Sequence, residues 1–385
     1  MSEAVIVEAV RTPIGRRGGK LAPVRPDDLL ALTLDEVTRR AGLDKAQVDD
    51  VVVGCVTQTG EQGLNIGRAA VLIAGFPIEV PGTTINRFCG SGQQAVNFAA
   101  QGVLSGAQDV VIGAGVESMT RVPMGSDALG PGEGPLSPRL SDLYEIIPQG
   151  NSAEMIARKW GFDRARLDEF SFQSHAKAGQ AIQEGRFQRE IMPITVQQNG
   201  SSYTVDTDEG VRIPPSREKM AQLKPSFQED GVVTAGNSSQ ISDGAAAVLV
   251  MTAEKAKELD LRPRARILAQ AIVGSDPTIM LTGPIPATAR VLRKAGLRLE
   301  DIDLFEVNEA FAPVVLAWQH ETGADMEKVN YNGGAIALGH PLGASGARLI
   351  TTLLHELERQ GARYGLSTMC IGYGMGIATV IERLD

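Results

Sequence analysis

Cys89 is the first residue of this 385-residue chain whose type and setting suggest chemistry. It stands in NRFCGSG, residues 86–92, between a predicted strand and a predicted helix. A thiol at the first turn of a helix is expected to have a lowered pKa, because the helix dipole favours the reactive thiolate. The alternative for a free cysteine is a small, buried apolar side chain. Position alone leaves both interpretations open.

A histidine and a second cysteine lie in two other glycine-rich segments. His340 stands in GGAIALGHPLGASG, residues 333–346, where the constrained turn before a helix suits a general base; an ordinary loop histidine is the alternative. Cys370 stands in MCIGYGMG, residues 369–376, at the end of an apolar strand. The backbone N–H groups of the glycines after it could form an oxyanion hole. A strand follows these glycines instead of a helix, so they do not match a dinucleotide-binding motif.

Asn308 directly follows the predicted strand 304–307, in NEAF at 308–311. Catalytic residues in α/β folds often lie where a strand ends, but asparagine is also a good helix cap. The remaining cysteine and histidines have weaker settings, and we expect structural roles for them: Cys55, His175, His320 and His355.

An internal repeat organises the elements that must position these residues. RAGL at 40–43 resembles KAGL at 294–297, and Ser91-Gly92 resembles Ser345-Gly346. Both pairs are 254 positions apart. A shared offset at two places predicts an internal duplication of roughly 120 residues.

Strands and helices alternate in both halves, which predicts an α/β fold with mostly parallel sheets. The predicted strands are 4–8, 51–54, 83–86, 110–113, 266–271, 304–307, 366–370 and 377–382. The predicted helices are 28–41, 66–74, 91–104, 287–294, 310–319 and 345–359.

The segment from about residue 117 to 237 interrupts this alternation. It contains a glycine- and proline-rich stretch, Gly125 to Pro138, and two further predicted helices, 153–160 and 167–184. We interpret it as an inserted domain that covers the substrate. The predicted domains are therefore 1–116 with 238–262, then 117–237, then 263–385.

Composition excludes several classes of protein. A formal net charge of -9 disfavours a nucleic-acid partner. With three cysteines, four histidines and no CxxC pair, neither a metal site nor a disulfide framework is expected. The first residues read as a strand, not as a signal peptide, and no apolar run suffices to cross a membrane. We expect a cytoplasmic protein.

In combination and in this order, the motifs around Cys89, Asn308, His340 and Cys370 resemble those of the thiolase family. VIVEAVRTPIG at 5–15 and TAGNSSQISDGA at 234–245 also fit its pattern, so that the resemblance covers nearly the whole chain. It implies the thiolase fold: two duplicated βαβαβαββ halves, a five-layered αβαβα core and an inserted loop domain.

The resemblance also implies residue roles. Cys89 would be the nucleophile that carries the acyl group, and His340 would take its proton. Cys370 would move a proton at the α-carbon. Asn308 would hold a water that forms one oxyanion hole with His340, and the backbone N–H groups of Cys89 and Gly372 would form the other. Thiolytic cleavage of a 3-oxoacyl-CoA, or the reverse Claisen condensation, would follow with ping-pong kinetics.

Coenzyme A and its thioesters would be substrates, with no permanently bound cofactor. By the same resemblance, Ser239 would contact the pantetheine and Arg212 the adenine. Phe227, Met280 and Phe311 match apolar pocket positions; ordinary core packing is the alternative for them. A homodimer or homotetramer is expected, with Gly125–Pro138 as the place for tetramer contacts.

One departure concerns the acyl chain. Short-chain acetoacetyl-CoA thiolases carry His-Met-Gly where this chain has Pro148-Gln149-Gly150. This favours a degradative enzyme for longer or bulkier 3-oxoacyl chains, and Tyr373 would shape the pocket mouth. Biosynthetic acetoacetyl-CoA thiolase and steroid side-chain thiolase remain alternatives. Ketoacyl and hydroxymethylglutaryl-CoA-type synthases are disfavoured by Asn308 and Cys370, and a non-catalytic acyl-CoA or sterol carrier by the complete cysteine and histidine set.

Overall fold

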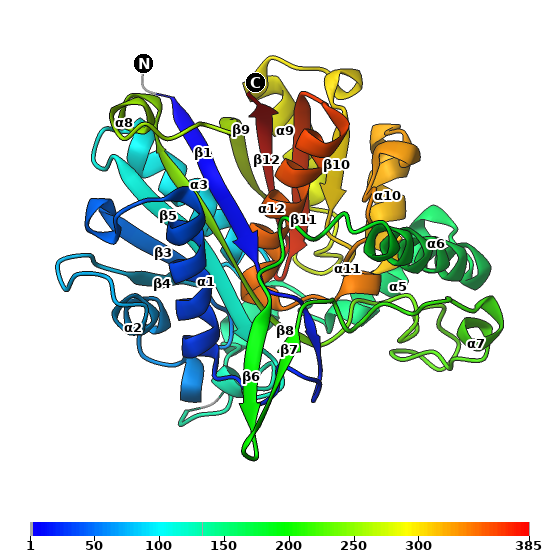
Figure 1. The fold of residues 1–385 in the computed structure, drawn as a ribbon. Coiled ribbons are helices and arrows are strands. Elements are labelled where there is room, and N and C mark those ends of the chain that lie inside the picture. The colour runs from blue at the N-terminus through cyan, green and yellow to red at the C-terminus, as the bar shows by residue number, and fades with distance from the viewer. Residues whose placement is uncertain (1–2, 133, 385) are drawn as a thin grey trace.

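The computed structural model describes residues 3–132 and 134–384, which form stacked layers of helices and strands (Figure 1). The first half contains β1 (Ala4–Arg11), β2 (Gly15–Arg16), α1 (Pro26–Ala41), β3 (Asp50–Gly54), α2 (Ile66–Ile73), β4 (Thr83–Ile85), α3 (Ser91–Leu104), β5 (Val110–Ser118), β8 (Ser242–Thr252) and α8 (Ala253–Glu258). The second half contains β9 (Ala265–Gly274), α9 (Pro284–Ala295), β10 (Leu304–Val307), α10 (Ala312–Thr322), α11 (Ala335–Leu338), α12 (Leu342–Gln360), β11 (Tyr364–Ile371) and β12 (Met375–Arg383).

The predicted duplication is confirmed by strand order and register. One continuous sheet runs β10-β11-β12-β9-β1-β8-β5-β3-β4 and reads the same outward from the β1–β9 contact: β1-β8-β5-β3 in one direction and β9-β12-β11-β10 in the other. In β3 and β5, Asp50 pairs with Val111. In β10 and β11, Leu304 pairs with Gly365, which is the same register 254 positions later.

Helices α3 and α12 form the middle layer. They pack against each other, and each also contacts strands of both half-sheets. Helices α1 and α2 cover the outer face of the first half-sheet, and α9 covers that of the second. Buried aliphatic side chains fill the interfaces, including Val96, Ala100, Ile350 and Leu354 from the two central helices. The layers therefore alternate αβαβα, as predicted.

The prediction of mostly parallel sheets was wrong. Strand β3 is parallel to β4 and β5, and β10 to β11, but β8 and β12 run antiparallel to both neighbours. Strand β12 follows β11 after a tight turn, which can only join antiparallel strands. Strand β8 was not predicted: the glycine and alanines at 244–247 lack the β-branched residues that signal a strand, although the apolar residues 248–251 after them carry that signal.

Between β5 and β8 lie α4 (Pro138–Leu143), α5 (Gln149–Trp160), α6 (Arg164–Gln183), a hairpin of β6 (Ile194–Gln198) and β7 (Ser201–Val205), and α7 (Arg217–Ala221). The two predicted helices correspond to α5 and α6, whereas the hairpin was not predicted. Helices α5 and α6 pack against α10 of the second half. The domain boundaries given above remain a prediction. Among the described residues, no helix has the length and apolar character needed to cross a membrane.

Candidate active site

Cys89 lies in a tight turn between β4 and α3. Phe88 before it has a φ of 45°, a left-handed conformation that is uncommon for a bulky residue. Ser91 holds this turn: its hydroxyl accepts from the N–H of Arg87 at 2.8 Å and donates to the carbonyl of Phe88 at 2.6 Å. The Cys89 side chain is buried, with Leu342 and Ile371 in the same apolar cluster.

The expected low pKa of Cys89 was wrong for this structure. Burial raises the pKa of the thiol to about 12, and the charge of Glu117 also raises it. The N–H groups of Cys89 and Gly372 and the side chain of Gln149 act in the opposite direction, by hydrogen bonding. Desolvation of the thiolate outweighs the N–H groups at the helix start. The resting sulfur is therefore a thiol that needs a base.

His340 is the predicted base, and it is held immediately before α12. Its backbone N–H donates to the carbonyl of Gln240 at 3.1 Å. Its Nδ1 lies 2.6 Å from the hydroxyl of Ser345, which itself donates to the carbonyl of Pro341 at 2.8 Å. Since that hydroxyl has one hydrogen, Nδ1 carries the ring proton and Nε2 is left with a lone pair. Burial, then the charge of Arg348, lowers the pKa of His340 to about 3, so the ring is neutral.

Asn308 meets His340 at that lone pair. It directly follows β10, and its side-chain Nδ2 lies 3.3 Å from Nε2 of His340. Its backbone N–H donates to the carbonyl of Thr368 in β11 at 3.0 Å, two residues before Cys370. Within the described part of the chain, the buried Oδ1 of Asn308 has no hydrogen-bond partner. A small polar molecule could bind there.

Cys370 lies near the end of β11 and is buried. Burial raises the pKa of its thiol, and the nearby charge of Cys89 raises it further, so the two sulfurs are close enough to interact. The turn after β11 then brings the N–H of Gly372 to Cys89. The structure thus connects Cys89 with Cys370 and Gly372, and Asn308 with His340, while the β10–β11 pairing links the two groups.

The predicted coenzyme A and pocket residues fall into two neighbouring groups. Met280 and Phe311 are buried in one apolar cluster with Cys370, and the ring of Phe227 packs edge-on against Phe311 with centroids 5.9 Å apart. Arg212 lies elsewhere, in a cavity of about 330 Å³ lined by loop-region residues that include Lys219. Ile336 belongs both to the cluster and to the wall of that cavity.

Ser239 lies between these groups. Its backbone N–H donates to the carbonyl of Ala310 at 2.9 Å, beside Phe311. The next residue in the chain, Gln240, lines the cavity of Arg212.

Sequence reasoning missed two polar neighbours of the site. Gln149 was noted only as a departure at the start of a helix, yet its side-chain Nε2 would lie 3.1 Å from a Cβ on Gly372, and its amide acts to lower the pKa of Cys89. Ser345 was noted only as a repeat marker, yet it orients His340. The position of Ser345 in the first turn after His340 was an available signal; nothing in the sequence connects residue 149 to residue 89.

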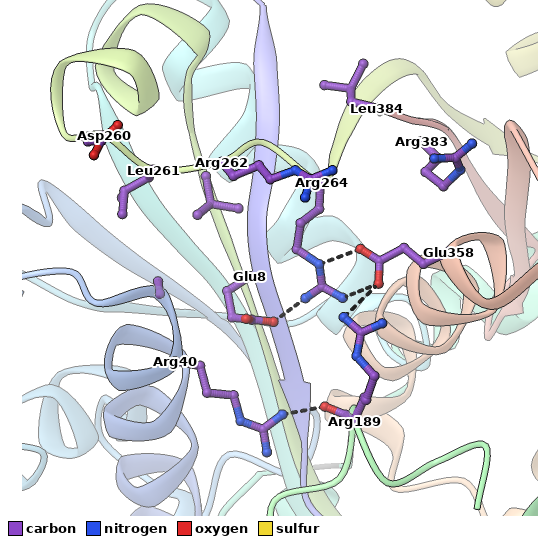
Figure 2. A pocket seen from close by; sticks show the side chains of 12 residues that line it. Glu8, Arg40, Arg189, Asp260, Leu261, Arg262, Arg264, Glu358, Arg383 and Leu384 are labelled. Carbon is purple, nitrogen blue, oxygen red and sulfur yellow. Dashed lines mark hydrogen bonds and ion pairs between the residues drawn. The ribbon is translucent and has the colours of Figure 1, made fainter. Parts of the chain in front are cut away.

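A larger cavity of about 570 Å³ lies away from these residues, between β1, α1 and α12 (Figure 2). Several arginines line it, and Figure 2 shows how acidic side chains engage them: Arg264 pairs with Glu8 and Glu358, and Arg189 pairs with Glu358 at 3.2 Å. None of the predicted site residues is among the described residues that line it. Size alone does not identify the active site.

Comparison with known proteins agrees with this geometry. Residues 4–254 match the family model for the thiolase N-terminal domain, and residues 261–383 match that for the thiolase C-terminal domain. The chain is 50% identical to a steroid 3-ketoacyl-CoA thiolase of Mycobacterium tuberculosis, over 100% of this chain and 95% of that protein. It is 45% identical to a 3-ketoacyl-CoA thiolase of Bacillus subtilis, over 99% of this chain and 100% of that protein.

A solved structure, the acetyl-CoA acetyltransferase of Bacillus anthracis, superposes with a TM-score of 0.92 at 41% identity, covering 100% of this chain and 99% of that one. Fold, family models and full-length relatives agree, and the chain belongs to the thiolase family.

Proposed function

We propose that this thiolase acts in two half-reactions, with Cys89 as the acyl carrier and Cys370 as the proton carrier. The observation that supports this most is that both thiols are buried and near each other, because Ile371, the residue after Cys370, lies in the same apolar cluster as Cys89. One thiol can then attack a carbonyl carbon while the other serves the neighbouring α-carbon.

The first half-reaction forms the acyl-enzyme. Nε2 of His340 takes the proton of Cys89, and the resulting imidazolium and thiolate stabilise each other where a lone charge would be costly. The thiolate attacks the 3-oxo carbon, and the N–H groups of Cys89 and Gly372 stabilise the oxyanion. The C2–C3 bond then breaks, leaving an acyl thioester on Cys89 and the enolate of acetyl-CoA.

The enolate is stabilised and then protonated at carbon. Nε2–H of His340 donates to its oxygen, together with a water held by the otherwise unpaired Oδ1 of Asn308. Cys370 gives its proton to C2 and becomes a thiolate, and acetyl-CoA leaves.

The second half-reaction returns the enzyme to its starting state. The Cys370 thiolate takes the proton of an incoming coenzyme A, whose sulfur attacks the acyl carbon. The bond to Cys89 breaks, and its sulfur recovers the proton from His340. Run in reverse, the same steps are a Claisen condensation, and both directions predict ping-pong kinetics.

We further propose that coenzyme A occupies the cavity of Arg212, with the adenine end there and the pantetheine passing Ser239. The cationic side chains of Arg212 and Lys219 suit a phosphate-bearing ligand. Phe227, Met280 and Phe311 would contact the acyl part. Each molecule of coenzyme A is a substrate, and no permanently held cofactor is required.

For the substrate, we propose 3-oxoacyl-CoA esters with chains longer than acetoacetyl, in degradation. Pro148-Gln149-Gly150, where short-chain acetoacetyl-CoA thiolases carry His-Met-Gly, supports this. The steroid 3-ketoacyl-CoA thiolase relative supports a steroid side chain as an alternative, and the acetyl-CoA acetyltransferase relative supports acetoacetyl-CoA synthesis as another. A kcat/KM series from acetoacetyl-CoA to long and steroid-bearing 3-oxoacyl esters distinguishes the three.

A homodimer or homotetramer is also proposed. Strand β4 is the end of the strand order, with β3 as its partner, and Leu64 and Ile78 nearby in the chain are strongly exposed. A second copy could cover them. A cytoplasmic location would suit the reduced thiols that the mechanism requires. Light scattering with and without residues 126–132 tests whether this loop carries tetramer contacts.

The decisive experiment follows coenzyme A-dependent loss of the magnesium–3-oxoacyl-CoA enolate absorbance. Wild-type protein should cleave at least one ester of the series. Cys89→Ala should abolish turnover while binding coenzyme A as before. Turnover by that variant would show that Cys89 is not the nucleophile.

A further inference from the structure

Glu309 directly follows Asn308, and its carboxylate is buried between three other segments of the chain. The exposed fraction of Glu309 is 1%. Its Oε2 accepts from the hydroxyl of Ser174 in α6 at 2.7 Å and from the backbone N–H of Ile336 in α11 at 3.1 Å. Its Oε1 accepts from Nδ2 of Asn330 at 2.9 Å. The residue beside the predicted oxyanion-hole amide therefore joins the end of β10 to α6 and α11.

The neighbours of Glu309 are oriented so that all three donate to it. The hydroxyl of Ser174 accepts from the N–H of Gly334 at 3.1 Å and gives its single hydrogen to the carboxylate. The amide of Asn330 is fixed by Val307, whose N–H donates to Oδ1 at 2.8 Å and whose carbonyl accepts from Nδ2 at 2.9 Å. Three donors around one buried side chain suit an ionised carboxylate, which can only accept.

The segment that leads to His340 packs tightly against this carboxylate. A Cβ on Gly334 would lie 2.3 Å from the carboxyl carbon of Glu309, so the chain can approach only because residue 334 has no side chain. Helix α11 begins at the next residue and ends at Leu338, two residues before His340. Glu309 thus fixes the segment before the predicted base against the strand end that carries Asn308.

The arrangement that depends on this packing is the contact between Asn308 and His340. Nδ2 of Asn308 lies 3.3 Å from Nε2 of His340, although the two residues are 32 positions apart in the chain. In the proposed mechanism both side chains act on one enolate oxygen, so their separation decides whether they can act together. Donors that are already in place need no rearrangement at the moment of reaction.

We propose that Glu309 is a positioning residue, whose buried carboxylate holds Asn308 and the segment before His340 in the arrangement that stabilises the enolate. It acts through these two residues and needs no contact with the substrate. This inference rests on the proposed function of Asn308 and His340.

The test is a double-mutant cycle on the exchange of the C2 hydrogens of acetyl-CoA in deuterium oxide, followed by mass spectrometry. Exchange requires the enolate and therefore reports the Asn308–His340 arrangement. Glu309→Gln keeps the size of the side chain but turns one acceptor into a donor. It should slow exchange about 10- to 100-fold, as expected when groups around a reacting centre are misplaced. In the Asn308→Ala background the same change should slow exchange less than about twofold, because the positioned amide is already absent.

Unchanged exchange in Glu309→Gln, or equal slowing with and without the Asn308 side chain, would overturn the inference. Unchanged exchange in Asn308→Ala would instead overturn the proposed function of Asn308. Glu300→Gln, the same change at an exposed position of the second half, is the matched control and should behave as wild type.

Ser174→Ala provides a second variant, because it removes one of the three donors and leaves Glu309 in place. It should slow exchange about threefold, as expected for one hydrogen bond, with KM for coenzyme A nearly unchanged. Thermal unfolding of each variant shows whether the fold is retained. If Glu309→Gln does not fold, the outcome depends on Ser174→Ala, and wild-type exchange in that variant would overturn the inference.

Discussion

Strand β3 in the first half ends at Gly54, and its counterpart β10 in the second half is followed, 254 positions later, by Asn308. The two places have the same strand register but opposite surroundings. A side chain at residue 54 would overlap the backbone of Ser91 in α3. Asn308 instead has room for its amide and places it on His340. The end of β3 has no room for a side chain, whereas the end of β10 carries a polar side chain that contacts His340.

The difference comes from how the two central helices begin. Helix α12 starts at Leu342, three residues before the position that matches the start of α3. This extra turn fills the strand ends of the first half: a Cβ on Gly343 would lie 2.5 Å from the carbonyl oxygen of Val116 and 2.7 Å from that of Gly54. Its N–H donates to the buried carboxylate of Glu117 at 2.8 Å.

Duplication thus produced two equivalent sets of strand ends. In the first half, the ends at Gly54 and Val116 pack against the first turn of α12, at Gly343. Val116 occupies the first-half position that matches Cys370, and Asn86 the one that matches His340. Cys89 is the first half's contribution, in the place of Gly343. The single site is asymmetric because its two halves supply different groups.

Removing the base should have the largest effect. Since the Cys89 thiol has a pKa of about 12, turnover depends on a group that accepts its proton. His340→Ala should lower kcat about 10³- to 10⁴-fold, the upper range for loss of a general base. Steady-state rates on the best 3-oxoacyl-CoA measure this, and calorimetry should show retained coenzyme A binding. His320→Ala, exposed on α10, is the control; a kcat within tenfold of wild type for His340→Ala would contradict the assignment.

A side chain added at Gly343, where α12 packs against the strand ends of the first half, should have the next largest effect, on stability. Gly343→Ala forces a methyl group against two backbone carbonyls that cannot move aside as a side chain could. Overpacking of this kind costs about 3 kcal/mol of the free energy of unfolding. Denaturant unfolding measures it, with Gly130→Ala, which has open space around it, as control. Equal stability of the two variants would mean that the helix start is not tightly seated.

Ser91 and Ser345, at matching positions of the repeat, provide a paired test with a smaller expected effect. Each holds a predicted catalytic residue: Ser91 the Phe88–Cys89 turn, and Ser345 the ring of His340. Ser345→Ala removes the partner that keeps the proton on Nδ1, so kcat should fall about tenfold, as expected for one hydrogen bond. Its thermal stability should stay near that of wild type. Ser105→Ala, after the end of α3, is the control, and a wild-type pH–rate profile for Ser345→Ala would argue against the orienting role.

These serines also show what the sequence could predict. Both serines belong to the segments that revealed the repeat offset of 254. That offset predicted the duplicated fold, and the strand register confirms it. The order of the motifs predicted which residues form the candidate site with Cys89 and Cys370. The catalytic roles of these residues stay predictions. Strand β8 was missed although residues 248–251 carry a strand signal; only its alanines at 245–247 carry little. The pKa of Cys89 was misjudged because burial depends on the packing of distant segments, which local sequence does not report.

The smallest effect concerns a buried charge that one half has and the other lacks. Glu306 in β10 pairs with Arg348 in α12 at 3.1 Å, at positions where the first half has Val52 and Gln94. Burial raises the pKa of Glu306 to about 8, even though Arg348 opposes the shift. Between its ordinary pKa of 4.5 and 8, the folded protein therefore holds a proton that the unfolded chain releases.

The stabilising contribution of Glu306 is thus fully present below about pH 4.5 and is lost as pH rises through 8. In wild type, the free energy of unfolding can fall by at most about 1.4 kcal/mol per pH unit through this one group, and the ion pair with Arg348 makes the fall smaller. Glu306→Gln has no proton to release, so its Tm should decline less than that of wild type between pH 5 and pH 8 on the same series of buffers. Glu300→Gln, exposed in the second half, should follow the wild-type curve. If Glu306→Gln also follows it, then Arg348 keeps the carboxylate ionised throughout, and the second half holds a buried ion pair where the first half has the uncharged residues Val52 and Gln94.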